Sequence, residues 1–262
     1  YQLGDLLRLR GDFDDAMAAY QEASSNGKPP IPGTALLHTS LGNHDAAEAD
    51  IRRALEAPTD RRTRAAILSA AAEILGAAGD IETASSAAEE LATMAEAVRA
   101  DQLHAMAAAA EASAALGSGD ARAALASAQR AASSWAQLDS PYEHALARVT
   151  AGVACLALDD QDAARFWLEP ARSTFEELGA VPDVERCTLL MPADGQSTAS
   201  PLTERQREVL VAVASGKTNA EIAKDLFVSE HTVRRHLQNI YTAIGVSSRA
   251  AATAYAYEHD LI

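Results

Sequence analysis

A short pattern recurs five times within the first 180 residues, and it restricts the fold more than any other feature. Each copy opens with Gly-Asp or a close variant and continues with small or apolar residues at offsets of 5, 9 and 12. The copies begin at Gly11, Gly42, Gly79, Gly119 and Asp159, at spacings of 31, 37, 40 and 40 residues. The three positions are, in order, Ala16, Tyr20, Ala23; Ala47, Ile51, Ala54; Ala84, Ala88, Leu91; Ala124, Ala128, Ala131; and Ala164, Leu168, Ala171. These offsets follow the period of an α-helix.

The repeated pattern predicts a stack of helical hairpins. Another helical stretch precedes each copy, for example residues 65–77 and 142–158. Glycine permits the tight turn after the first helix, and Asp or Asn caps the second. Alanine at the point of closest approach lets the two helices of a hairpin meet. We therefore expect an all-α, solenoid-like region over residues 1–180, with a generic alanine-rich bundle as the alternative.

The first copy resembles a tetratricopeptide repeat. Its residues Leu3-Gly4, Leu7, Ala16, Tyr20, Ala23 and the exit Pro29-Pro30 fall where that family's pattern expects them. The later copies are longer and match only in spacing, so the region is described as TPR-like. Tyr1 leads into the first helix without a cap, which suggests that earlier repeats or another domain precede it.

Residues 181–200 interrupt the pattern and are predicted to form a linker. Gly179-Ala180-Val181-Pro182 and the stretch 192–201 are rich in Pro, Gly and Ser, and only a short helical turn is expected at 184–190. The remaining segment, residues 201–262, is predicted to be a separate domain.

Charge is divided unevenly between these regions. The net charge is −15, yet residues 201–262 hold seven basic and seven acidic side chains, so the whole excess of acid lies in residues 1–200. Phosphate repels an acidic surface, so any contact with DNA must come from residues 201–262. No apolar run reaches the ~18 residues of a membrane span, which argues against a membrane partner. Cys155 and Cys187 form no metal or disulfide pattern, which indicates a cytoplasmic protein.

Residues 201–262 carry the start and stop signals of four helices. Thr203 with Gln206, and Thr218 with Glu221, have the spacing of capping boxes. The turn Phe227-Val228-Ser229 precedes a third helix, which Ser229 caps and Gly245 stops after about Ile244. Ser247 or Ser248 caps a fourth helix over residues 250–257. Two short helices joined by a tight turn are typical of a helix-turn-helix.

The third helix of this segment has one apolar and one polar face. At 100° per residue, Val233, Leu237, Ile240 and Ile244 form a core stripe. The opposite face carries His231, Arg234, Arg235, Gln238 and Thr242. Arg and Gln suit bidentate contacts with guanine and adenine in the major groove. A solvated surface is the alternative for the arginine pair, and it is an equal alternative to a groove contact for His231.

The whole segment resembles the LuxR family of bacterial regulators. Four runs carry the resemblance: Leu202-Thr203-x-Arg205-x-x-Glu208-Val209-Leu210, Gly216-Lys217-Thr218-Asn219-x-Glu221-Ile222-Ala223, Leu226-x-Val228-Ser229-x-x-Thr232-Val233-Arg234-x-His236-Leu237 and Gly245-Val246-x-Ser248-Arg249. It implies a four-helix domain that binds double-stranded DNA as a homodimer in a bacterial cell, at the nucleoid when bound. Gln206 stands where the family usually has Glu, and Gln serves a capping box equally well.

The resemblance, together with the helix faces, assigns candidate site residues. Base contacts are expected from Arg234, Arg235 and Gln238, and from His231. Phosphate contacts are expected from Lys217, Thr218, Asn219, Ser229, Thr232 and Arg249, and a packing or phosphate role is expected for His236. Dimer or core contacts are expected from Ala251 and Tyr255.

The sequence contains no catalytic or metal-binding motif, so we expect neither enzymatic activity nor a bound cofactor or metal. Gly216-Lys217-Thr218 ends like a phosphate-binding loop, but Val211 stands where that loop needs its first glycine. The sequence therefore predicts a transcriptional regulator whose repeats bind a peptide, protein or small effector and so control dimerisation. A TPR-like adaptor with weak DNA binding is the alternative. An upstream nucleotide-binding domain is compatible with the first reading.

Overall fold

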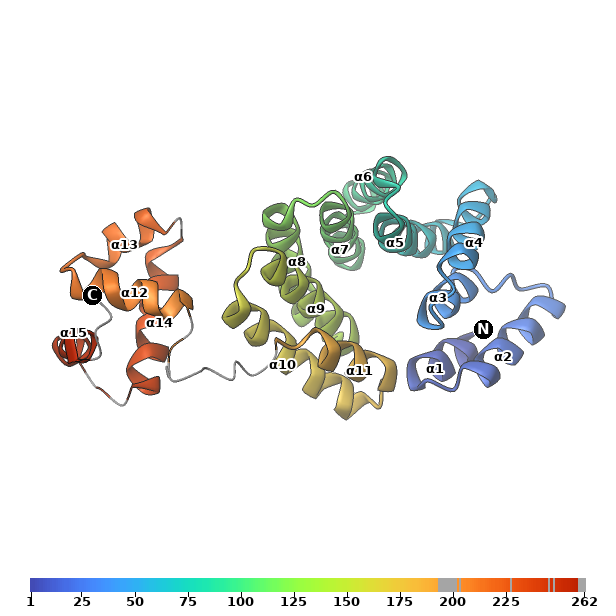
Figure 1. Cartoon of the computed structure of the whole chain (residues 1–262). Coiled ribbons are helices and arrows are strands. Elements are labelled where there is room, and N and C mark those ends of the chain that lie inside the picture. The colour runs from blue at the N-terminus through green and yellow to red at the C-terminus, as the bar shows by residue number, and fades with distance from the viewer. Residues whose placement is uncertain (193–201, 203, 227, 245, 247, 259–262) are drawn as a thin grey trace. The chain divides into compact units, whose positions relative to one another are not determined.

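The chain is a succession of α-helices in two compact units, Tyr1–Pro192 and Ala193–Ile262 (Figure 1). The computed structural model describes residues 1–192, 202, 204–226, 228–244, 246 and 248–258, without the side chains of residues 204, 231, 242, 243 and 258. Every regular element within these residues is a helix, as the all-α prediction requires. None of the described helices is long and apolar enough to cross a membrane.

The first unit contains eleven helices within the described residues, which form five hairpins and one final helix. They are α1 (Gln2–Arg10), α2 (Phe13–Ser25), α3 (Gly33–Ser40), α4 (His44–Glu56), α5 (Arg61–Ala78), α6 (Ile81–Val98), α7 (Asp101–Gly117), α8 (Ala121–Gln137), α9 (Pro141–Ala157), α10 (Gln161–Leu178) and α11 (Val181–Leu190). The second helix of every hairpin begins two residues after the first residue of a sequence repeat.

The predicted caps act as hydrogen-bond acceptors in the last three hairpins. The carboxylates of Asp80, Asp120 and Asp160 accept bonds from backbone N–H groups three residues on, at 3.2, 2.9 and 3.0 Å. Asp12 and Asn43 occupy the same position without such a bond. Asp159 adopts the left-handed conformation, φ 58°, that glycine has at the start of the other copies.

Alanine separates the helices of each hairpin by the smallest available side chain. Of the three repeat positions, the first is a fully buried alanine in all five hairpins: Ala16, Ala47, Ala84, Ala124 and Ala164. The other two positions are also buried in every copy. Glycine allows still closer contact, because a Cβ on Gly117 of α7 would lie 2.6 Å from the carbonyl oxygen of Gly76 in α5. The repeat positions predicted to face another helix are thus confirmed as buried.

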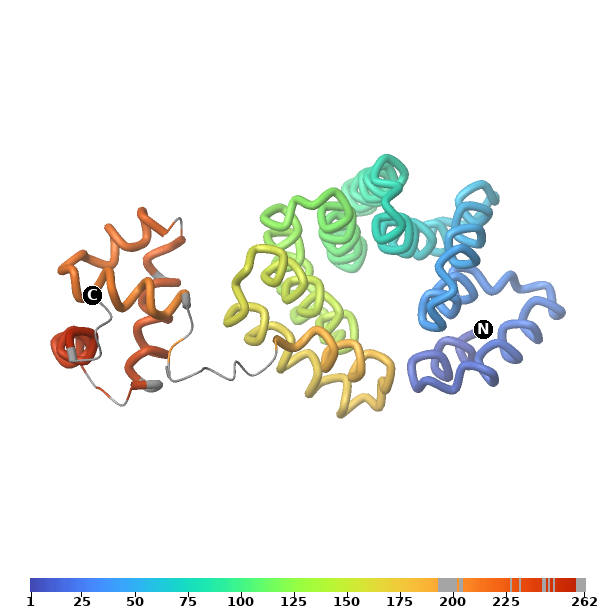
Figure 2. The backbone as a smooth tube through the Cα atoms, in the orientation of Figure 1, coloured from blue at the N-terminus to red at the C-terminus, as the bar shows by residue number. Residues whose placement is uncertain are grey.

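The first unit curves until its last helix reaches its first. Helix α11 packs on α10 and also contacts α1, and the path of the backbone can be traced in Figure 2. A Cβ on Gly11 would lie 3.5 Å from Cγ of Pro182, so the end of α1 meets the start of α11. The Tyr142 hydroxyl of α9 donates to Asp183 of α11 at 3.0 Å, and this bond, the charge of Arg186 and the charge of Arg8 in α1 each lower the pKa of Asp183. Burial outweighs these three effects and leaves the pKa of Asp183 raised.

The boundary of the repeat region lies later than expected. Residues 181–190, predicted to begin the linker, form α11, and the first compact unit extends to Pro192. Proline is tolerated in the first turn of a helix, so Pro182 does not break α11. Cys187 is fully buried, and Val184 and Leu190 pack beside it against the α9–α10 core. Residues 193–200 of the predicted linker lie outside the described residues.

The second unit has a separate core. Helices α12 (Glu204–Ala214), α13 (Asn219–Asp225), α14 (Glu230–Ala243) and α15 (Arg249–Glu258) surround buried apolar side chains. Val209, Leu210, Ile222, Val233 and Ile240 are fully buried in this core. The four helices predicted for residues 201–262 are therefore present, although Thr203, Phe227, Gly245 and Ser247 lie outside the described residues.

Replacing Gly117 with alanine tests the close contact between α5 and α7. The added methyl would meet backbone atoms of Gly76, which cannot rotate away as a side chain can. We expect a loss of about 1–3 kcal/mol in the free energy of unfolding, measured by urea denaturation. Ser118→Ala, at an exposed neighbouring position, should change it by less than about 0.5 kcal/mol. Equal effects of the two substitutions would contradict the contact.

Candidate nucleic-acid interface

Helices α13 and α14 form the helix-turn-helix, and α12 supports them. α13 packs against α14, and α12 contacts α13, α14 and α15. Val233 and Ile240 of α14 are fully buried, Leu237 is buried, and Ile244 lies partly buried at the end of the helix. This stripe is the one predicted from the sequence. It fixes which side of α14 faces away from the core.

The outward side of α14 presents the predicted base-reading residues. Arg234 is 69% exposed at its side chain, and its guanidinium lies 3.8 Å from the Glu230 carboxylate, a weak and exposed pairing. Gln238, one helical turn further, is exposed, and Arg235 beside them is half-buried. These three side chains therefore lie on neighbouring positions of one surface. The side chains of His231 and Thr242 lie outside the described residues.

Side-chain caps define the starts of α13 and α14. The Thr218 backbone N–H donates to Oε2 of Glu221 at 2.7 Å, and the Glu221 N–H donates to the Thr218 hydroxyl at 3.3 Å, a complete capping box. Ser229 accepts from the Thr232 N–H at 3.1 Å, and their hydroxyls lie 2.8 Å apart. These bonds confirm both predicted caps. Thr218 and Ser229 are exposed, so both caps face solvent.

Three further residues expected to contact phosphate, Lys217, Asn219 and Arg249, also have partners within the domain. The Arg249 guanidinium donates from Nη1 to Oδ1 of Asn219 at 2.9 Å and from Nη2 to the Lys217 carbonyl oxygen. Nζ of Lys217 lies 2.6 Å from the Asp225 carboxylate in an exposed ion pair. The sequence could not show these pairings, since they join α15 to the start of α13, or the turn before α13 to the end of that helix.

Two further residues occupy the flanks of the core. His236 is buried, which fits the packing alternative considered for it. Arg205, which carries part of the family resemblance but has no role predicted from it, donates from Nη2 to the Leu226 carbonyl oxygen at 2.8 Å and from Nη1 to Glu208 at 2.7 Å. It satisfies a carbonyl at the end of α13, a group that the helix itself leaves unpaired. An arginine in the first turn of a helix carries no periodic signal of such a role.

Helix α15 divides into a packed and an exposed side. Ala252 and Ala256 are fully buried, and Tyr255 packs partly buried against the core. Ala251, the other expected dimer contact, is half-buried. The exposed side consists of Ala250, Ala254 and Tyr257, the last 61% exposed. Ser248 caps this helix by accepting from the Ala251 N–H at 3.2 Å, one of the two alternatives predicted.

This arrangement of α12–α15 defines a helix-turn-helix domain. The model of the family "Bacterial regulatory proteins, luxR family" matches residues 200–256, so the domain is a luxR-type helix-turn-helix. A tetratricopeptide repeat model matches residues 35–60, in the second hairpin. The resemblance of residues 201–262 is thus confirmed, and that of the repeat region is confirmed at the second hairpin, whereas the sequence indicates the first.

Named relatives are similar to parts of the chain. Transcriptional regulatory protein LiaR of Bacillus subtilis is 43% identical over 61 residues, 23% of this chain and 29% of the relative. The response regulator protein VraR of Staphylococcus aureus is 41% identical over 61 residues, 23% and 29% of the two chains. The putative HTH-type transcriptional regulator Mb0914c of Mycobacterium bovis is 38% identical over 93 residues, 36% of this chain and 10% of the relative. The similarity thus spans less than a third of each relative. No solved structure matches the chain.

Acidification should loosen the start of α13. Hydrogen bonds from the backbone and hydroxyl of Thr218 lower the pKa of Glu221 below its ordinary value of 4.5. A lowered pKa stabilises the folded state above that ordinary value, and this stabilisation is lost as the pH falls through the folded-state pKa. We expect amide hydrogen exchange at Thr218 to speed up relative to α14 as the pH drops below about 4.5. Glu221→Gln should remove this dependence; its persistence would assign the effect to another group.

Proposed function

We propose that this chain is a DNA-binding transcriptional regulator. The observation that carries the proposal is the surface of α14, where Arg234 and Gln238 project from the second helix of a luxR-type helix-turn-helix. Such a helix lies in the major groove, where Arg and Gln discriminate guanine and adenine by paired hydrogen bonds. Thr218, Ser229 and Thr232 flank this surface and are proposed to contact phosphates, with His231 as a further base contact.

The proposed DNA complex is a homodimer that places two copies of α14 on neighbouring half-sites. The exposed Ala250, Ala254 and Tyr257 of α15 offer a small apolar surface for a second copy. Ala251 and Tyr255 border that surface and complete the proposed contact. Because residues 201–262 carry no net charge, one domain alone gains little from phosphate attraction, and pairing two domains multiplies the effective affinity.

Arg234→Ala and Arg235→Ala test the base contacts. Each should weaken binding to a selected DNA site by about 1–3 kcal/mol and relax the sequence preference at one position. The site is obtained by selection from random DNA, where a two-fold symmetric consensus is expected. Binding is then measured by fluorescence anisotropy at several salt concentrations. Arg122→Ala in α8 makes the same change in charge on the repeat unit and should leave binding unchanged.

A uniform loss across all DNA sequences would assign the arginines to phosphates instead. Absence of any selected consensus, with unchanged weak binding in both variants, would favour a TPR-like adaptor with weak DNA binding.

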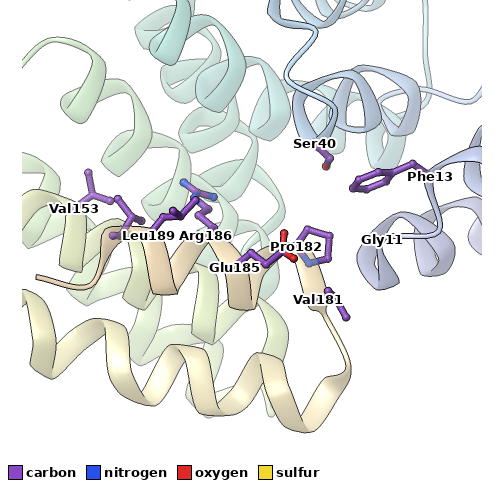
Figure 3. A pocket seen from close by; sticks show the side chains of 10 residues that line it. Gly11, Phe13, Ser40, Val153, Val181, Pro182, Glu185, Arg186 and Leu189 are labelled. Atoms are coloured by element: carbon purple, nitrogen blue, oxygen red, sulfur yellow. The ribbon is translucent and has the colours of Figure 1, made fainter. Parts of the chain in front are cut away.

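The repeat unit is proposed to bind the effector on its inner side. A cavity of about 730 Å³ lies where the end of the unit meets its beginning, between α11, the α1–α2 turn and the end of α3 (Figure 3). Phe13 and Ser40 face Pro182 across it, and Leu189 contributes an 87% exposed apolar side chain. A volume in this range suits a small molecule or a few residues of peptide.

A second cavity of about 470 Å³, lined mainly by α5, α7 and α9, shares Val153 and Arg186 with the first. Glu73, Glu143 and Arg186 line it, and the charge of Arg186 also acts on the nearby carboxylate of Asp183. Charged groups of both signs beside apolar walls suit a ligand with the same mixture, such as a short peptide. Its binding is proposed to control dimerisation and thereby DNA binding.

A thermal-shift screen of tripeptides against the whole chain tests this site. A ligand that binds only the folded state raises the unfolding temperature as its concentration exceeds Kd. We expect hits whose basic side chain pairs with Glu73 and Glu143 and whose C-terminal carboxylate pairs with Arg186, so Arg186→Gln should remove most of their effect. Arg122→Gln serves as the matched control. Hits that are indifferent to Arg186→Gln, or DNA affinity that is indifferent to every hit, would contradict the effector proposal.

A further inference from the structure

Arg249, the first residue of α15, uses its side chain inside the domain. Nη1 donates to the Asn219 side-chain oxygen at 2.9 Å, and Nη2 donates to the Lys217 carbonyl oxygen. Asn219 and Lys217 flank Thr218, the cap of α13. One guanidinium thus holds both sides of that cap, although the three residues lie about thirty positions earlier in the sequence.

This pair of bonds joins elements that otherwise pack on different neighbours. The main packing partner of α15 is α12, whereas that of α13 is α14. Arg249 therefore links the helix proposed to face a second copy with the first helix of the helix-turn-helix. Because the guanidinium is planar and offers several N–H donors in a fixed fork, it can serve two acceptors at once. A lysine ammonium has the same charge without that geometry.

We infer that Arg249 is a positioning residue for DNA binding, and not one of its phosphate contacts. It fixes α13 relative to α15, and through the α13–α14 contact it fixes the angle at which α14 is presented. This inference rests on the proposed function, since it assigns a role within the same DNA-binding domain. It reverses the role that the family resemblance implies for Arg249. It also makes the orientation of the helix-turn-helix dependent on α15.

Charge and geometry can be separated by comparing Arg249→Lys with Arg249→Ala in the full chain. A positioning role predicts that both variants weaken binding to the selected DNA site about tenfold, because both lose the two bonds. A phosphate contact predicts that lysine retains most of the affinity, while alanine reduces the slope of log K against log salt by about 0.9. For positioning, that slope stays constant in both variants. Arg122→Lys in α8 is the matched control.

The partner residue supplies a second test. Asn219→Ala should weaken binding several-fold in the wild-type background and less than about twofold in the Arg249→Ala background, because the two residues act as one contact. The inference would be overturned if the losses in affinity from the two substitutions were additive, or if the Arg249→Lys variant bound DNA with wild-type affinity. Neither outcome would affect the proposed function, which fails separately if no DNA site is selected.

Hydrogen exchange measures the link without DNA. In Arg249→Lys, the amides of Thr218, Glu221 and Ile222 should exchange roughly fivefold faster or more, because the start of α13 opens locally more often. The Ile240 amide in α14 should stay within about twofold of its wild-type exchange rate, because α14 does not open with it. Unchanged exchange at α13 would overturn the inference even if no DNA site were known. Equal acceleration in α13 and α14 would also overturn it, since it would show a general loss of stability.

Discussion

The close contact of helices through alanine is the constraint on which the repeat unit depends. A fully buried alanine stands at the same position of all five hairpins, and larger side chains such as Tyr20 and Leu168 enter only one turn later. Each alanine buries little apolar area, so no single hairpin can be stable by itself. Stability comes from stacking, and stacking requires the regular spacing that the alanines and the Gly76–Gly117 approach allow.

Local patterns in the sequence predict the hairpins well, because local chemistry determines them. The turn residue, the acidic cap and the buried alanine all lie within a few positions of one another, and the structure uses them as expected. The meeting of α1 with α11 had no such signal. It brings Gly11 beside Pro182, 171 residues later, and depends on small rotations accumulated over every hairpin. The final helix is longer than the short turn predicted at residues 184–190, because Pro182 indicates a break when read alone, whereas the structure places it in the first turn of α11.

In the DNA-binding domain, too, the sequence predicts local features well and contacts between distant residues poorly. Helical period predicts the buried stripe of α14 and therefore the opposite, exposed face. Capping boxes predict where α13 and α14 begin. A resemblance, however, transfers a role to a position without showing which neighbour its side chain meets in the free protein. Arg249 and Lys217 illustrate this limit, since both satisfy groups of their own domain. Such pairings depend on how the helices fold back on one another, and sequence spacing does not contain that information.

These internal pairings matter because the domain has few positive charges that could attract DNA. Its seven basic side chains are balanced by seven acidic ones. Arg205 pairs with Glu208, Lys217 pairs with Asp225, and Arg249 holds the start of α13. Because these cationic side chains are paired inside the domain, the domain has little general attraction for phosphate, and the acidic repeat unit adds none. In the proposed complex, recognition therefore rests on the few side chains of α14 that face outward and on the angle at which α14 is presented. That angle becomes more important, because so little non-specific affinity compensates for a misplaced helix.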